Sequence, residues 1–184
     1  IAISLLLGGA KSSQPSDAPA QKDYEVLNDR SAALNGRGRY AEALEQADKA
    51  LELNPNYSFA WNNKCVALIG LGRHDEALVA ADRALEANPL NAVAWTNKAL
   101  VYRQTKRLDD ALKAMERAVL IDSNNPLIWY NKACYHAIKN DRAGALESLA
   151  RALKLEPKLK SLAAKESDFD ALKEDPEFKK LVRK

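Results

Sequence analysis

Three tryptophans, Trp61, Trp95 and Trp129, recur at intervals of 34 residues along this chain of 184 residues. Each is followed by an asparagine two positions later and by a lysine three positions later. A fixed period of this length indicates an array of similar units stacked side by side, because one such unit alone cannot bury its apolar face. The period constrains the fold more than any other feature of the sequence.

Each unit has the pattern of two helices joined by a tight turn. In residues 58–91 the first helix carries an apolar stripe at helical spacing, formed by Trp61, Cys65 and Leu68. Gly72 follows, at a place where helices commonly end because glycine accepts positive φ. Pro89 then marks the end of the second helix, since proline cannot continue the backbone hydrogen bonding.

The same frame fits four consecutive segments, which we predict to be the repeats: 24–57, 58–91, 92–125 and 126–159. Alanines recur at matched places on the second helices, as in Ala43, Ala77, Ala111 and Ala145. Small residues allow the two helices of a unit to approach closely, and we expect the large indole rings to fill the gap to the next unit. We therefore predict an all-α fold.

At these positions the chain resembles the tetratricopeptide repeat family over residues 24–159. The resemblance implies a right-handed α-solenoid of helix-turn-helix repeats, in which the first helix of each unit lines a concave surface. Some positions depart from the family pattern: Leu27 replaces tryptophan, Ser123 replaces proline, and Lys64, Lys98 and Lys132 stand where leucine is usual. Lys106 and Asn140 occupy the glycine position of the third and fourth turns. Lysine accepts left-handed φ less readily than asparagine, so we predict a strained or reshaped third turn.

Composition narrows the class of function. The net charge of +3 is small, and no clustered Lys/Arg face indicates nucleic-acid binding. His74 and His136 have no partners at metal-ligand spacing, and no nucleophile–base set or phosphate loop is present in the sequence. We expect no cofactor, no metal and no enzyme activity. Cys65 and Cys134 lie two units apart, so we expect buried thiols and no disulfide.

The two ends differ from the repeats. Residues 1–23 combine an apolar segment, Ile1 to Ala10, with a Pro/Ser/Ala linker. The apolar segment is similar to the end of a signal-peptide core or of a membrane anchor, and an unspecified peptide is the alternative. We expect an exported or membrane-anchored protein, with a cytoplasmic location as the alternative.

Residues 160–184 are predicted to cap the last repeat, whose apolar face would otherwise meet water. Ser167 and Asp170 have the spacing of a capping box, and Asp175-Pro176 the pattern of a helix start. The predicted buried residues are Phe169, Leu172, Phe178 and Leu181. This string is similar to a closing segment found after bacterial and archaeal tetratricopeptide arrays.

The resemblance places the candidate binding residues on the first helices. They are Phe59, Asn62, Asn63, Val66, Thr96, Asn97, Leu100, Arg103, Tyr130 and Asn131. Asparagine both donates and accepts, so the row of Asn63, Asn97 and Asn131 either grips the backbone of a bound peptide or bonds the neighbouring helix. The row of Lys64, Lys98 and Lys132 either packs along the core with its ammonium groups toward water or an acid, or binds anions.

Some relatives clamp the acidic carboxy-terminal tails of chaperones with lysines, an arginine and asparagines. This chain has Asn28 and Val93 where two of those lysines belong, and Asn97 where the arginine belongs. We therefore predict that it does not bind such tails. The function predicted is a non-enzymatic scaffold that binds a segment of a partner protein in the concave groove. The alternatives are a self-associating scaffold of a membrane-associated assembly and a regulatory module of a longer protein.

Overall fold

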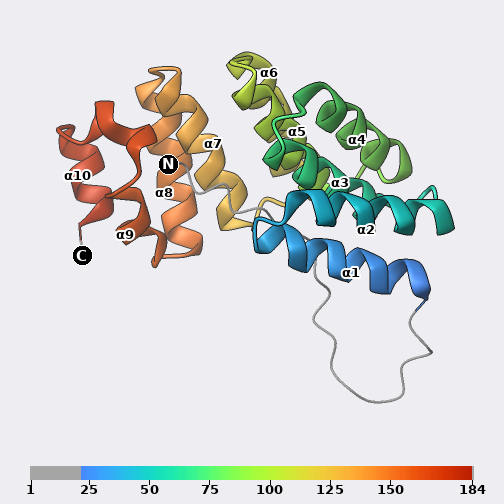
Figure 1. The fold of residues 1–184 in the computed structure, drawn as a ribbon. Coiled ribbons are helices and arrows are strands. Elements are labelled where there is room, and N and C mark those ends of the chain that lie inside the picture. Colours follow the sequence, from blue (N-terminus) through green and yellow to red (C-terminus); the bar gives the residue numbers. More distant parts are fainter. Residues whose placement is uncertain (1–21, 184) are drawn as a thin grey trace.

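The computed structural model describes residues 22–183, which form a curved stack of helix pairs (Figure 1). The four pairs are α1 (Asp23–Gly36) with α2 (Tyr40–Leu53), α3 (Ser58–Gly70) with α4 (His74–Ala87), α5 (Ala92–Gln104) with α6 (Leu108–Ile121), and α7 (Pro126–Ile138) with α8 (Arg142–Leu155). Residues 22–183 contain no strand. The prediction of an all-α solenoid is confirmed. The predicted signal or anchor segment lies outside the described residues, and no helix in 22–183 is long and apolar enough to cross a bilayer.

Small side chains hold the two helices of each unit together. Each second helix has two alanines at matched positions with no exposed surface: Ala43, Ala50, Ala77, Ala84, Ala111, Ala118, Ala145 and Ala152. Because a methyl group is short, the first helix of the same unit can lie directly against it at close-packed density. The largest cluster of core side chains runs without interruption from the third unit through the fourth to the C-terminal segment.

The first helices lie on the inner side of the curve. Each second helix contacts the first helix of its own unit and that of the next, while α1 also contacts α3, and α3 contacts α5. Helices that reach across to the next unit's equivalent helix lie at the smaller radius of a curved stack. This arrangement makes the first helices the lining of the concave surface (Figure 1).

The four turns inside the repeats share one backbone conformation. Gly38, Gly72, Lys106 and Asn140 adopt φ values of 72°, 73°, 61° and 60°. The third turn is therefore not reshaped. It keeps the left-handed geometry, and the strain falls on Lys106, whose Cβ crowds the backbone in that conformation.

The tryptophans are less buried than expected. Trp61, Trp95 and Trp129 are partly buried, and each indole nitrogen donates to a carbonyl of the preceding exit turn, at 2.7, 3.2 and 2.9 Å. Each ring also has a lysine ammonium 5.3–5.6 Å from its centre. The indoles thus lie at the seams between units, packed on one side against the buried clusters and partly open to water on the other.

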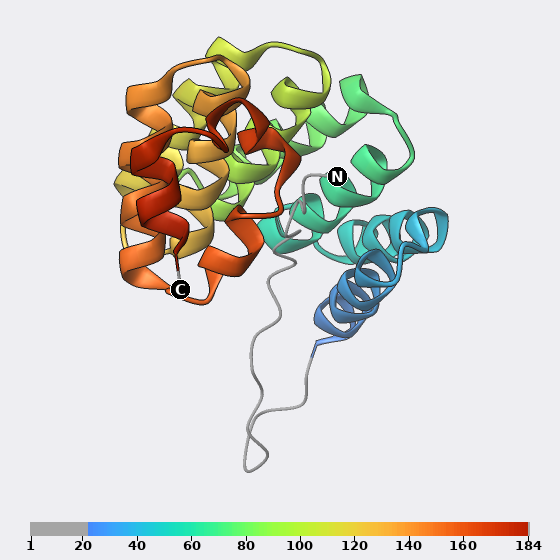
Figure 2. The same ribbon diagram turned by 90° about the vertical axis from the view of Figure 1, so that its left-hand side faces the viewer.

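The C-terminal segment contains α9 (Leu159–Ala163), the short 3-10 helix η1 (Ser167–Leu172) and α10 (Pro176–Val182). Phe169, Leu172 and Phe178 are buried as predicted, and Leu181 is partly buried. The predicted start at Asp175 is confirmed, since its carboxylate accepts from two backbone N–H groups of α10. The predicted capping box at Ser167 is wrong: Ser167 is already the first residue of η1, whose start has no side-chain cap. Figure 2 faces this end of the array.

Replacing Lys106 with glycine is expected to raise the free energy of unfolding by about 1 kcal/mol, because glycine adopts positive φ without steric cost. Urea unfolding measures the change. The mirror variant Gly72→Lys is the control: no atom lies within 4 Å of a Cβ at that site, so only the backbone conformation is penalised. A loss of stability on Lys106→Gly would contradict the strain at this turn.

Truncating Trp95 to alanine is expected to cost about 2 kcal/mol, below the 3–5 kcal/mol typical of a fully buried ring, because part of the indole already faces water. Leu68→Ala, at a fully buried site, is expected to cost more, about 3 kcal/mol, although leucine is smaller. Thermal melts of the two variants give the order. If Trp95→Ala lowers the free energy of unfolding more than Leu68→Ala does, the indole contributes more to stability than its partial exposure indicates.

Candidate functional site

The predicted binding residues lie on α3, α5 and α7, whose inward faces we call the inner wall. Seven of them are buried: Asn62, Asn63, Val66, Thr96, Asn97, Leu100 and Tyr130. The other three, Phe59, Arg103 and Asn131, are partly exposed. Buried polar side chains dominate this set, so its hydrogen bonds decide what the wall can do.

Asn63 joins the first unit to the second. Its amide nitrogen donates to the side-chain oxygen of Asn28 at 2.7 Å, and the amide of Asn35 donates to the Asn63 carbonyl at 2.9 Å. All three side chains are buried. For Asn63 the structure therefore favours the interpretation in which the asparagine bonds the neighbouring helix.

Several buried side-chain amide atoms of α1, α3 and α5 lack hydrogen-bond partners among residues 22–183. They are the side-chain oxygens of Asn35, Asn62 and Asn63 and the amide nitrogen of Asn97. A buried polar atom without a hydrogen bond costs roughly 1–3 kcal/mol. Because these atoms are buried, the partly exposed Phe59, Arg103 and Asn131 are the members of the predicted set that a partner can contact directly.

The fourth-unit end of the inner wall is covered by the chain's own C-terminal segment. The Asp168 carboxylate accepts two hydrogen bonds from the Arg103 guanidinium, both at 2.9 Å. These residues lie 65 positions apart, on η1 and α5. Both side chains are largely enclosed, with 18% and 10% of the Arg103 and Asp168 side chains exposed.

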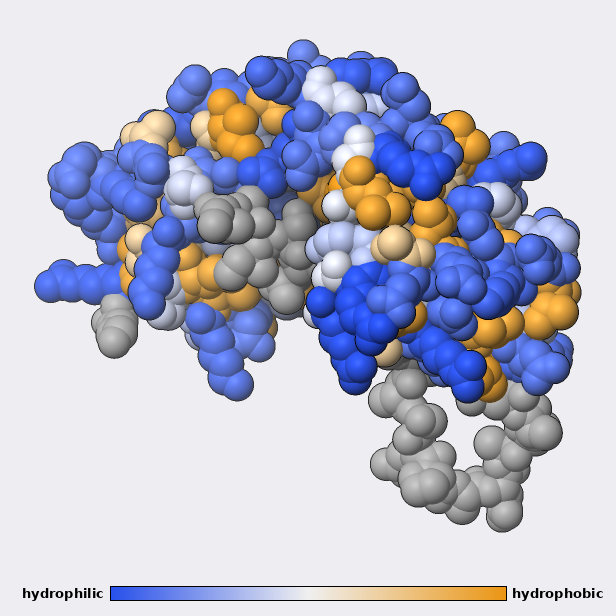
Figure 3. Space-filling model, in the orientation of Figure 1, coloured by the Kyte–Doolittle hydropathy of each residue, from blue (hydrophilic) through white to orange (hydrophobic). Residues whose placement is uncertain are grey.

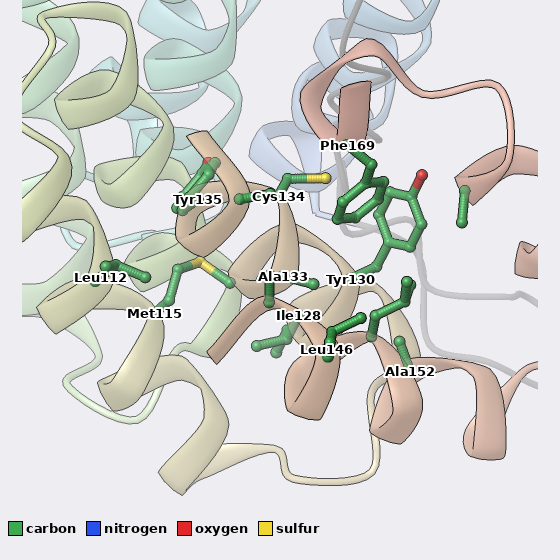
Figure 4. Close-up of a cluster of buried hydrophobic side chains, with 14 of the residues drawn as sticks. Leu112, Met115, Ile128, Tyr130, Ala133, Cys134, Tyr135, Leu146, Ala152 and Phe169 are labelled. Atoms are coloured by element: carbon green, nitrogen blue, oxygen red, sulfur yellow. The ribbon is translucent and has the colours of Figure 1, made fainter. Parts of the chain in front are cut away.

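Next to this ion pair, Phe169 packs on the wall. Its ring meets the Tyr130 ring edge-on, with centroids 5.9 Å apart and planes at 88°, and the Cys134 side chain points toward the two rings (Figure 4). Phe169 has no exposed surface. The Tyr130 hydroxyl is buried and has no hydrogen-bond partner within residues 22–183. Tyr130, predicted as an anchor for a partner, is thus occupied by Phe169.

Burial controls the ionisation of this cluster. It raises the pKa of the Asp168 carboxyl above its ordinary value, although the Arg103 charge opposes the shift. Burial likewise raises the pKa of the Cys134 thiol, and the nearby Asp168 charge adds to the effect. The thiol therefore stays protonated beside Asp168. Cys65 is also buried and free, as predicted.

The lysine row lies at the seams between units. Lys64 pairs with Asp48 at 2.7 Å and Lys98 with Asp82 at 2.6 Å, each acid being on the second helix of the preceding unit. Lys132 stacks over Trp129 at 5.5 Å. These contacts favour the packing interpretation of the row over the anion-binding one.

Apolar side chains reach the surface mainly as small patches among hydrophilic ones on the face in Figure 3. Exposed large residues include Val79, Leu90 and Leu120. Residues 22–183 contain no group of His, Cys, Asp and Glu side chains able to hold a metal ion. His136 instead hydrogen-bonds Asp141 at 2.8 Å in the fourth turn.

Sequence reasoning missed Asp168 as a contact of the wall. It predicted that Phe169 would be buried, but not that the residue before it would pair with a different unit. The available signal was chemical: Arg103 is the cationic member of the predicted wall set, and Asp168 is an acid directly before an aromatic in the closing segment.

Comparisons with known proteins agree with this architecture. Models described as tetratricopeptide repeats match residues 34–89, 63–126 and 127–159. A comparison with curated proteins found no match.

Solved structures give the same picture. TTC0263, a thermophilic TPR protein of Thermus thermophilus, has a TM-score of 0.72 at 23% identity, over 77% of this chain and 78% of that one. MamA of Desulfovibrio magneticus RS-1 has a TM-score of 0.63 at 27% identity, over 74% and 77%. The first TPR of Spaghetti (RPAP3), bound to the HSP90 peptide SRMEEVD, has a TM-score of 0.53 at 21% identity, over 56% and 82%. The chain belongs to the tetratricopeptide repeat family.

Proposed function

We propose that this chain holds an extended or helical segment of a partner protein on its inner wall, without catalysing a reaction. The observation that carries the proposal is the inner wall itself, where the matched first helices line the concave side and Phe59, Val93 and Arg103 stay partly exposed. Partly exposed apolar side chains beside polar ones suit a protein segment, which needs both apolar anchors and hydrogen bonds. The family's role as a protein-interaction module supports the same conclusion.

The partner segment is proposed to lie along the first three units. At the fourth unit the chain's own Phe169 covers Tyr130, whereas Phe59 on α3 and Val93 at the matched position of α5 are partly exposed. These two apolar side chains would receive side chains of the partner. Arg103, also partly exposed, stands where this stretch meets the C-terminal segment.

The partner is not proposed to be an acidic chaperone tail. Spaghetti, which carries such a peptide, shares only the fold with this chain at 21% identity. Here Asn28 donates toward Asp29 and accepts from Asn63 within the wall, and Val93 and Asn97 are neutral. Neutral groups cannot neutralise a terminal carboxylate together with flanking acids.

Replacing Val93 with glutamate is expected to lower partner capture at least about tenfold, because a desolvated, unpaired carboxylate in the groove costs more than about 1.4 kcal/mol of binding free energy. The fold should persist, since the position is in the first turn of α5, where an acid interacts favourably with the helix dipole. Affinity capture from the source cell with quantitative mass spectrometry measures the loss.

The matched control is Val79→Glu, the same substitution on the second helix α4 at a site that is 60% exposed. It should leave capture unchanged. Circular dichroism must show equal helicity in both variants. If Val93→Glu recovers every partner at wild-type levels, the inner wall is not the binding surface and the proposal fails.

A further inference from the structure

The contact between η1 and the inner wall does more than cap the array. A cap has to cover the terminal unit, and apolar side chains suffice for that. Asp168 instead reaches Arg103, which belongs to the third unit. An ion pair to an internal unit adds nothing to the cover of the end face, so this contact has another role.

The contact has the geometry by which a guanidinium recognises a carboxylate. A guanidinium that bonds both oxygens of one carboxylate fixes its position and its orientation. Yet burial raises the pKa of Asp168 despite Arg103, so the ionised carboxylate is less favoured here than in water. A buried pair of this kind selects its partner's chemistry without adding much stability, and the pair is therefore exchangeable.

The fit of the chain's own segment is incomplete. The Tyr130 side chain is 2% exposed, and its hydroxyl has no hydrogen-bond partner in the described part of the chain although Phe169 packs against the ring. A ligand that carries a hydrogen-bond acceptor past the aromatic ring would satisfy this hydroxyl. η1 therefore leaves one polar group of the site without a hydrogen bond.

The segment η1 and the helix α10 are held by different contacts. Residues 167–172 form a 3-10 helix, whose hydrogen-bond geometry is poorer than that of an α-helix, and its start has no side-chain cap. By contrast, α10 has its own attachments: Asp175 caps it and pairs with Arg142 of α8 at 2.6 Å. Displacing η1 also breaks the contact of Phe169 with Phe178 of α10, whose ring centroids are 5.5 Å apart, so a partner has to supply an aromatic ring of its own.

We propose that the surface formed by Arg103, Tyr130 and Cys134, here called the Arg103–Tyr130 surface, recognises a partner segment in which an acidic residue is followed by an aromatic one. The chain's own Asp168 and Phe169 are the intramolecular competitor that the partner displaces. This inference rests on the proposed function: it extends the partner segment from the first three units onto the fourth and adds the chemistry of that part. The acid bonds Arg103, the aromatic ring packs on Tyr130, and a following acceptor bonds the Tyr130 hydroxyl.

The probe is a fluorescent, end-blocked peptide with the sequence of residues 166–172, titrated onto the full chain by fluorescence anisotropy. The variant Phe169→Ala weakens the internal competitor and leaves the surface intact. It is expected to bind the peptide at least about tenfold more tightly than the wild-type chain, in which the tethered segment has a high effective concentration. Adding Arg103→Gln to that variant should remove most of the gain.

Two control peptides separate the parts of the motif. One is the same peptide with Asp168→Asn and Phe169→Ala. The other is SRMEEVD, also of seven residues, which is acidic but lacks an aromatic residue. Both should bind the Phe169→Ala variant at least about tenfold more weakly than the probe does, because each lacks an anchor.

Alkylation by iodoacetamide locates the bound peptide. Cys134 lies under the segment and Cys65 lies in the second unit, so the second thiol is an internal control. The probe should slow alkylation of Cys134 in the Phe169→Ala variant and leave the rate at Cys65 unchanged. If that variant melts, Asp168→Asn, which keeps the ring packing, replaces it in every measurement.

Three results would overturn the proposal: a folded variant that does not bind the probe at about millimolar concentration, equal binding with and without Arg103→Gln, or equal binding of SRMEEVD. The two proposals fail separately. If the probe does not bind but Val93→Glu removes captured partners, the groove function stands and this recognition chemistry falls. If Val93→Glu removes none, the groove function falls whatever the probe does.

Discussion

The close approach of two helices at alanine is the contact on which the whole structure depends. In every unit a fully buried alanine near the start of the second helix, and another near its end, set the distance to the first helix. Because the same spacing recurs every 34 residues, each unit stacks on the next with a similar rotation, and a curve results. The curve brings the first helices to the inside, so the inner wall is a consequence of residues that never touch a ligand.

The fold could be predicted from the sequence because its determinants are local. Glycine at positions 38 and 72 indicates left-handed turns, and the period places Lys106 and Asn140 in the same conformation. The tryptophans show where this reasoning ends. Their spacing predicted a packed stripe, but the depth of a ring depends on how closely neighbouring helices approach, and the indoles lie at the seams. The spacing of residues in a sequence predicts which face of a helix they lie on, but not how deeply their side chains are buried.

The position of the candidate site could be predicted from the sequence, but the contacts that its residues make could not. The repeat register and the resemblance to the family together placed Asn62, Asn97 and Tyr130 on one wall, and the structure places them on the matched helices α3, α5 and α7. The sequence could not show that Asn63 hydrogen-bonds Asn28 of the first unit, nor that Phe169 packs on Tyr130. Both depend on the path of a segment that is distant in sequence. Contacts of that kind follow from the assembled curve, after the local rules have already been satisfied.

The Arg103–Asp168 pair also changes how the array should come apart. Solenoids unzip from their ends, because each module is coupled only to its neighbours. Among the described hydrogen bonds, the next longest link joins residues 35 positions apart, against 65 for this pair. Together with the buried cluster that runs from the third unit to Phe178, this contact closes the C-terminal half into a loop and couples its modules into one cooperative block. Fraying should therefore start at α1 and travel toward the third unit, which leaves the two ends with unequal dynamics.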